Sequence, residues 1–141
     1  MDIRHLTPAY AVSPQITPED VPALRAAGFA AVICNRPDAE NPDGLRAADL
    51  RAAVEAAGME FIENPLVPGA FTPENIAVQA RVQDDTAGPV FAYCASGNRS
   101  SIAWAMTQAG RIPTEELIAR AARWGYNLEP FRARLDDLAK R

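Results

Sequence analysis

Short apolar runs alternate with helical segments along the chain, and this alternation constrains the fold more than any other feature. Residues 10–13, 29–34, 59–62 and 90–93 have the length and apolar composition of buried strands. The helical segments between them are too long for hairpin turns, and they favour parallel pairing through right-handed crossovers. We therefore expect an α/β fold, a single three-layer domain over residues 1–141 with a small, mainly parallel sheet flanked by helices.

Capping signals mark where the helices begin and end. Thr17 and Thr72 are each followed by a proline and an acidic residue, which is typical of a helix N-terminus. Gly28 and Gly58 follow two of the helical stretches, as C-terminal caps do. These signals predict helices over residues 17–27, 45–57, 72–84, 100–108, 114–124 and 130–140.

The composition excludes several classes of protein. Of the 141 residues, 48% are apolar and 23% are charged, so the chain can build a core and is not intrinsically disordered. No apolar run reaches the roughly 18 residues that span a membrane, and the N-terminus lacks a signal-peptide pattern. A net charge of −4 argues against binding to nucleic acid or to membranes. We expect a soluble, cytoplasmic protein.

Two cysteines and one histidine limit the covalent and metal chemistry. Cys34 and Cys94 are too few for a disulfide framework, and His5 alone leaves no zinc-binding spacing. We therefore expect a reducing compartment, no metal and no cofactor. A Ser-His-Asp triad is also disfavoured, because no nucleophile elbow accompanies His5.

One segment carries the candidate chemistry. After the strand at 90–93, the chain continues through a short glycine-containing loop into a helix start, with the residues Cys94, Ala95, Ser96, Gly97, Asn98, Arg99 and Ser100. The backbone N–H groups of the four residues after the cysteine can converge with those of the helix N-terminus into an anion-binding nest. Gly97 permits the positive φ that such a curl requires. The segment thus predicts a cradle for a small anion.

Each polar side chain of this cradle has an expected role. Cys94 faces the amides and the positive end of the helix, which favours the nucleophilic thiolate. Arg99 offers a planar fork to a bound oxyanion, and Ser100 can donate its hydroxyl proton to the sulfur. The alternative is a buried structural cysteine beside a surface arginine, but all the parts occur in the order that builds a cradle. Cys34 has no such loop after it, so we expect it in the core.

The cradle segment resembles two families of cysteine enzymes. Its Cys-x-x-Gly-x-Arg-Ser pattern is similar to the loop of single-domain rhodaneses and to the phosphate loop of cysteine phosphatases. Together with Val-Ser-Pro-Gln-Ile at 12–16 and Asn-Arg-Pro-Asp-Ala-Glu at 35–40, it resembles the phosphatase-like domain of the β-lactamase hydrolase-like family. The resemblance implies a fold similar to that of dual-specificity tyrosine phosphatases. Members of the family are also fused to sulfide- and persulfide-handling enzymes, which implies sulfur metabolism.

The length of the loop bears on the choice between phosphate and sulfur. Cysteine phosphatases have one residue more than the four that separate Cys94 from Arg99, and the smaller ring suits a single sulfur atom held as a persulfide, as in rhodaneses. Tyr93 also stands where phosphatases have a histidine before the cysteine. Both departures favour sulfur chemistry.

A phosphatase further needs a general acid to protonate its leaving group. The loop at 65–71, where such an acid is expected, contains no acidic residue. Asp38, Glu40 and Glu63 are candidates only if the fold brings them over Cys94. Sulfur transfer needs no strong acid, because sulfite or a thiolate leaves readily.

We therefore predict a rhodanese-like sulfurtransferase. Cys94 attacks the outer sulfur of thiosulfate or of a small persulfide, holds it as a persulfide, and passes it to a thiol acceptor. The first alternative is a phosphomonoester hydrolase similar to tyrosine and dual-specificity phosphatases, with the same nucleophile. The second is a non-catalytic module that binds anions or senses sulfur. The sequence leaves open whether Cys34 acts as a resolving thiol.

Overall fold

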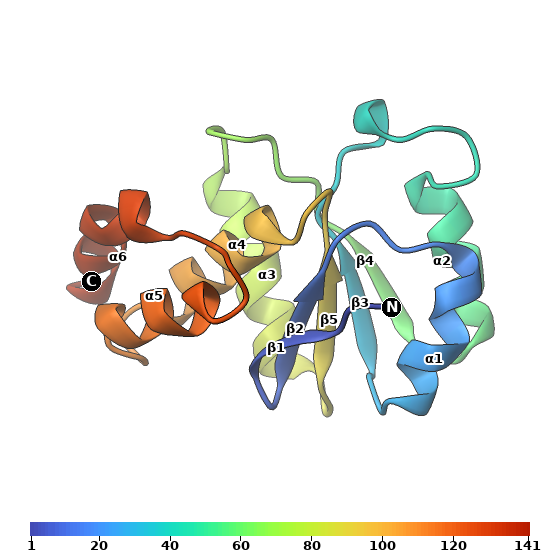
Figure 1. The fold of residues 1–141 in the computed structure, drawn as a ribbon, viewed down its shortest axis with the longest axis horizontal. Helices are drawn as coiled ribbons and strands as arrows, with labels where there is room; N and C mark the ends of the chain where they lie inside the picture. Colours follow the sequence, from blue (N-terminus) through green and yellow to red (C-terminus); the bar gives the residue numbers. More distant parts are fainter.

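The strands form one sheet at the centre of the molecule. The computed structural model describes residues 1–141, with strands β1 (Arg4–Thr7), β2 (Tyr10–Ser13), β3 (Ala31–Cys34), β4 (Glu60–Glu63) and β5 (Val90–Tyr93). Their order across the sheet is β1-β2-β5-β3-β4 (Figure 1). β1 pairs antiparallel with β2, and all other neighbours are parallel. The predicted α/β fold with a mainly parallel sheet is therefore confirmed.

Six helices cover the sheet: α1 (Val21–Ala26), α2 (Ala47–Ala56), α3 (Pro73–Asp85), α4 (Asn98–Gln108), α5 (Thr114–Ala122) and α6 (Arg132–Ala139). Short 3-10 helices occupy Pro18–Asp20, Asp38–Glu40 and Glu129–Phe131. α1 and α2 lie on one face of the sheet, and the other four helices lie toward the opposite side (Figure 1). None of them combines the length and apolar character needed to cross a bilayer.

The two central strands show why the apolar runs are continuous. Every residue of β3 and β5 is buried, because helices cover both faces of the sheet. Side chains alternate along a strand, so Ile33 and Ala92 enter the core beneath α3 to α6, whereas Val32 and Phe91 enter the core beneath α1 and α2.

Two elements differ from the expected ones. β1 was not predicted because its Arg-His-Leu-Thr sequence has one buried residue, Leu6, and therefore no apolar run. It is an edge strand that joins the sheet through a tight connection to β2. α4 begins at Asn98 rather than at residue 100, so the helix starts directly after Gly97 and includes Arg99 in its first turn.

The carboxyl ends of the parallel strands meet at one edge of the sheet. Ser13 ends β2, and the residues that directly follow β3, β4 and β5 are Asn35, Asn64 and Cys94. Ligands of open α/β sheets bind at this edge. The topology therefore brings polar residues distant in sequence to the position of the predicted cradle.

Candidate active site

Cys94 lies at the carboxyl end of the central strand β5, and its side chain meets a main-chain donor. The residue is 1% exposed. The Gly97 N–H group donates a hydrogen bond to the Cys94 Sγ atom over 3.0 Å. The sulfur thus faces an amide of the loop, which is the arrangement that an anion-binding cradle requires.

Position 97 of the loop accepts only glycine. Its φ is +97°, a left-handed conformation that strains other residues. A Cβ atom here would lie 2.1 Å from the Tyr126 hydroxyl oxygen and 3.3 Å from the Ser13 carbonyl oxygen. The loop therefore depends on glycine for both its conformation and its close packing.

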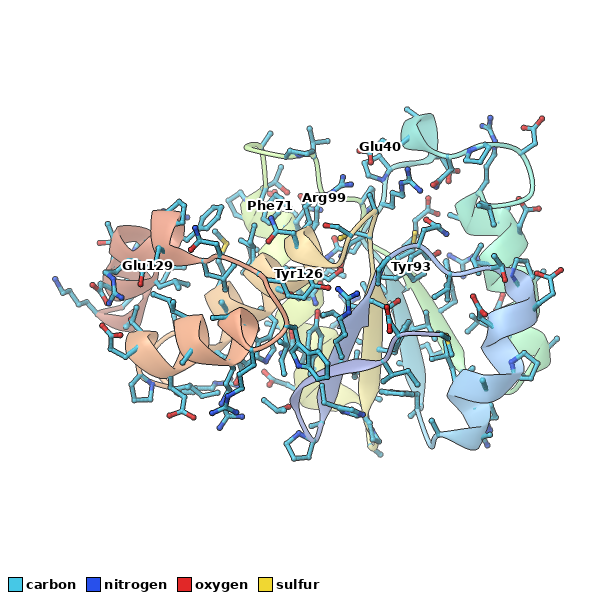
Figure 2. All side chains as sticks on the ribbon, in the orientation of Figure 1. Glu40, Phe71, Tyr93, Arg99, Tyr126 and Glu129 are labelled. Atoms are coloured by element: carbon cyan, nitrogen blue, oxygen red, sulfur yellow. The ribbon has the colours of Figure 1, made fainter.

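Tyr126 fixes the loop from the segment between α5 and α6. Its hydroxyl donates to the Ser96 carbonyl oxygen over 2.8 Å and accepts a hydrogen bond from Arg4 Nη1 over 2.7 Å. Arg4 belongs to β1, so both ends of the chain hold the loop. Figure 2 shows Tyr126 beside the strand ends. The sequence alone did not identify Tyr126 as part of the site.

Several amides of the loop have no acceptor within the chain. The Asn98 N–H group donates to Ser96 Oγ over 3.2 Å. The N–H groups of Ala95, Ser96, Arg99 and Ser100 donate to no other group of the protein. Unsatisfied donors at a helix N-terminus attract anions, both by hydrogen bonding and through the helix dipole.

The Arg99 guanidinium is held in place by a bidentate ion pair. Its Nη1 and Nη2 atoms donate to the two carboxylate oxygens of Glu40 over 2.8 and 2.7 Å, and Nη1 also donates to the Leu66 carbonyl oxygen over 2.8 Å. The side chain is 11% exposed. The hydrogen bond with Glu40 raises the pKa of Arg99, and the electrostatic interaction with Cys94 raises it further. These three hydrogen bonds use Nη1 and Nη2 and leave the Nε–H group out.

Glu40, one of the candidate general acids, holds the Arg99 guanidinium in a bidentate ion pair. Its hydrogen bond with Arg99 lowers the pKa of the Glu40 carboxyl group, and Arg36, 3.5 Å away, lowers it further. A lowered pKa favours the ionised carboxylate, which argues against Glu40 as a proton donor. Figure 2 shows Glu40 and Arg99 close together above the strand ends.

The other two candidate acids, Asp38 and Glu63, have other surroundings. An oxygen of Asp38 accepts a hydrogen bond from the Ala47 N–H group over 2.8 Å, so it satisfies a donor at the start of α2. Glu63 lies opposite Cys34 in the parallel register of β3 and β4. Neither of them lines the cavity beside the Cys94 loop. The structure therefore gives no support to either as an acid for this site.

Ser100 bonds to a different partner from the one expected. Its hydroxyl donates to Asn35 Oδ1 over 2.8 Å rather than to the Cys94 sulfur. Asn35 in turn donates to Gln79 Oε1, Gln79 Nε2 donates to the Tyr10 hydroxyl over 2.8 Å, and Tyr10 donates to the Ser100 carbonyl oxygen over 2.9 Å. These four buried residues form a closed polar network below the loop. The sequence analysis overlooked Gln79, a polar residue on the buried face of α3 that indicates such a network.

Cys34 and Tyr93 lie on the opposite face of the sheet from the Cys94 side chain. They are partners in the register of β3 and β5, and both enter the core beneath α1 and α2. Because successive residues of a strand point to opposite faces, Cys94 faces away from Tyr93. Burial raises the pKa of the Cys34 thiol. The expectation of a core cysteine holds, and its position argues against a resolving role.

A cavity of about 740 Å³ opens beside the loop. Ser96, Asn98 and Arg99 form one wall, and the others come from residues 68–76, from α4 and from the C-terminal residues 131–141. The lining is mainly apolar, contains three arginines and has no aspartate or glutamate. Nowhere in the chain do three or more histidine, cysteine or acidic side chains cluster as metal ligands would.

Proteins of related sequence match most of this chain. The family model for the phosphatase-like domain of β-lactamase hydrolase-like proteins matches residues 2–111. A β-lactamase hydrolase-like protein of Agrobacterium fabrum is 31% identical over 111 residues, which are 77% of this chain and 26% of that protein. One from Xylella fastidiosa is 26% identical over 130 residues, 91% of this chain and 30% of that protein. The chain thus spans less than a third of these curated relatives.

Solved structures share the fold. A candidate phosphatase from Neisseria meningitidis has a TM-score of 0.84 at 33% identity, and the match covers 98% of this chain and 99% of that one. TpbA of P. aeruginosa, in complex with phosphotyrosine, has a TM-score of 0.71 at 15% identity, with coverages of 98% and 88%. The second likeness concerns the fold alone and confirms the expected cysteine-phosphatase-like architecture. On the match over residues 2–111, the chain belongs to the phosphatase-like domain family of β-lactamase hydrolase-like proteins.

Proposed function

We propose that this protein is a phosphomonoester hydrolase with Cys94 as its nucleophile. The observation that carries the proposal is the pairing of the Cys94 sulfur with the Gly97 amide beside an Arg99 guanidinium that Glu40 holds in place. Unpartnered loop amides can receive the oxygens of a phosphoryl group, and the free edge of Arg99 matches two of them. The phosphotyrosine bound to TpbA is consistent with a small anionic substrate for this fold.

The reaction has two steps. The Cys94 thiolate attacks phosphorus, an S–P bond forms, and the bond from phosphorus to the leaving oxygen breaks with its electron pair on that oxygen. A water molecule then attacks the phosphocysteine, which releases inorganic phosphate and restores the thiolate. Arg99 and the loop amides stabilise the charge on the phosphoryl oxygens in both steps.

The sulfurtransferase predicted from the loop length has less support than the phosphatase alternative. The family and the similar structures described above are phosphatase-like. The ring with four intervening residues still presents an amide to the sulfur and an arginine beside it, so the shorter loop does not remove the features that bind an oxyanion.

The decisive experiment offers both substrates to one preparation. Wild type should release 4-nitrophenolate from 4-nitrophenyl phosphate, with a phosphoryl group on the quenched protein by intact mass, and should gain no sulfur from thiosulfate. Cys94→Ser should lose the turnover, whereas Cys34→Ala, altered on the other face of the sheet, should keep it. A mass gain of sulfur on wild type but not on Cys94→Ser, without phosphate release, would restore the sulfurtransferase. If the protein neither releases phosphate nor gains sulfur, that result would indicate the non-catalytic module.

A further inference from the structure

The cavity beside the Cys94 loop continues away from Arg99 to the C-terminal helix. Arg134 and Arg141 line it, together with Phe131 and Leu138. We propose that Arg134 and Arg141 bind a second anionic group of the substrate, and that this substrate is an aryl phosphate carrying that group beyond its ring. The proposal rests on the hydrolase function above and adds the class of substrate.

Charge supports the second anion. Arg99 lies on the loop side of the cavity, Arg134 and Arg141 come from the C-terminal residues, and no acidic side chain lines the space between them. Arg134 has no hydrogen-bond or ion-pair partner within the chain, and Arg141 pairs only with the exposed Asp137, over 3.1 Å. An unpaired arginine beside one whose only partner is exposed, both at the wall of a cavity, suits a carboxylate or a phosphate.

The apolar lining supports the aryl ring. The cavity surface between the arginines is formed largely by aromatic and aliphatic side chains: Phe71, Ile76, Ile102, Met106, Phe131 and Leu138. Such a lining favours a flat apolar group over a sugar or a short alkyl chain. Figure 2 shows Phe71 on the loop between β4 and α3, between the loop arginine and the C-terminal helix.

The second subsite comes from a part of the chain that the family model does not match. That match ends at residue 111, whereas α6 begins at Arg132. The Cys94 loop and most of the apolar lining therefore lie within the matched residues, whereas Arg134 and Arg141, which would bind the second anion, lie outside them.

The test compares two substrates that differ only in one charge. They are the phosphate ester of 3-(4-hydroxyphenyl)propionate and that of the corresponding primary amide, whose phenols are similar leaving groups. We expect wild type to favour the carboxylate by about fivefold in kcat/KM, mainly through KM. Arg134→Ala and Arg141→Ala should each reduce this preference. Arg81→Ala, which removes an exposed arginine of α3 outside the cavity, should retain it.

Binding separates this proposal from the proposed hydrolase. Calorimetric titration of Cys94→Ser with the same two esters measures the preference without turnover. One outcome is that wild type hydrolyses neither ester while Cys94→Ser still binds the carboxylate more tightly, and Arg134→Ala removes that preference. This result would support the second subsite and contradict the proposed hydrolase. Equal turnover and equal binding of the two esters, or a preference unchanged in Arg134→Ala, would overturn the second subsite.

Discussion

At the scale of single residues, Gly97 is the most constrained position of the site. Gly97→Ala should lower kcat/KM about a hundredfold, because the added methyl group displaces the Tyr126 hydroxyl and shifts the amide that faces Cys94. Positive φ adds a destabilisation of about 1 to 3 kcal/mol. The measurements are aryl phosphate turnover and urea unfolding.

Gly58→Ala is the matched control for this substitution. Gly58 also has a positive φ, +82°, but a Cβ atom there would meet nothing within 4 Å. The variant should lose about 1 kcal/mol of stability and retain full turnover. Equal activity losses in the two variants would show that Gly97 has no special role in the site.

The Glu40–Arg99 pair predicts a second residue-scale effect. Glu40→Gln should lower kcat/KM about tenfold, because Arg99 loses its charged bidentate partner. Glu116→Gln removes the exposed ion pair with Arg120 and should leave turnover unchanged. Turnover that is unaffected in Glu40→Gln would contradict the positioning role.

The same pair predicts how stability depends on pH. The folded state lowers the pKa of Glu40 below its ordinary value of 4.5. The pair therefore stabilises the protein fully above that value, and its contribution is lost as the pH falls through the lower folded-state pKa. Urea unfolding of wild type and Glu40→Gln from about pH 7 to about pH 3 should show a stability difference that shrinks in acid. A difference that grows in acid would be inconsistent with this linkage.

At the scale of elements, the polar network below the loop joins β2, β3, α3 and α4. Gln79→Met removes its hydrogen bonds with Tyr10, Asn35 and Asn64. Buried polar groups that lose their partners should cost about 1 to 3 kcal/mol of unfolding free energy. Gln83→Met, one turn further along α3 and partly exposed, should cost less. Equal midpoints in urea would mean that the network does not stabilise these elements.

The elements also show where sequence reasoning succeeded. The capping residue Thr72 accepts a hydrogen bond from the Asn75 N–H group over 3.1 Å and begins α3, as its sequence predicts. β1 was missed because an edge strand with one buried residue has no apolar pattern. Local signals identify an element only where burial of that element requires an apolar pattern.

At the scale of the whole molecule, the cavity walls predict how the rate depends on the leaving group. No acidic side chain lines the cavity beside the Cys94 loop, so for the proposed hydrolase we expect the leaving oxygen to depart with its charge instead of receiving a proton from a carboxyl group. Without a general acid, the reaction rate is lower by about a hundredfold or more, and the loss is largest for basic leaving groups. A series of aryl phosphates should therefore react faster as the phenol becomes more acidic, and simple alkyl phosphates should react at least that much more slowly. Similar rates for alkyl and aryl phosphates would reveal a proton donor.

The sequence by itself determined the α/β class, the succession of β2 to β5 and the six helices along the chain, and the Cys94 loop. These features are local, since capping residues, apolar runs and the amides of residues 95–100 belong to short continuous segments. Tertiary structure alone decided which distant groups meet the loop: Glu40, 59 residues from Arg99, and Asn35, 65 residues from Ser100. It also placed Arg134 of α6 and Arg141, two residues after that helix, at the cavity. The physical reason is that such partners are chosen by how the helices pack against the sheet, and no spacing along the chain records that packing.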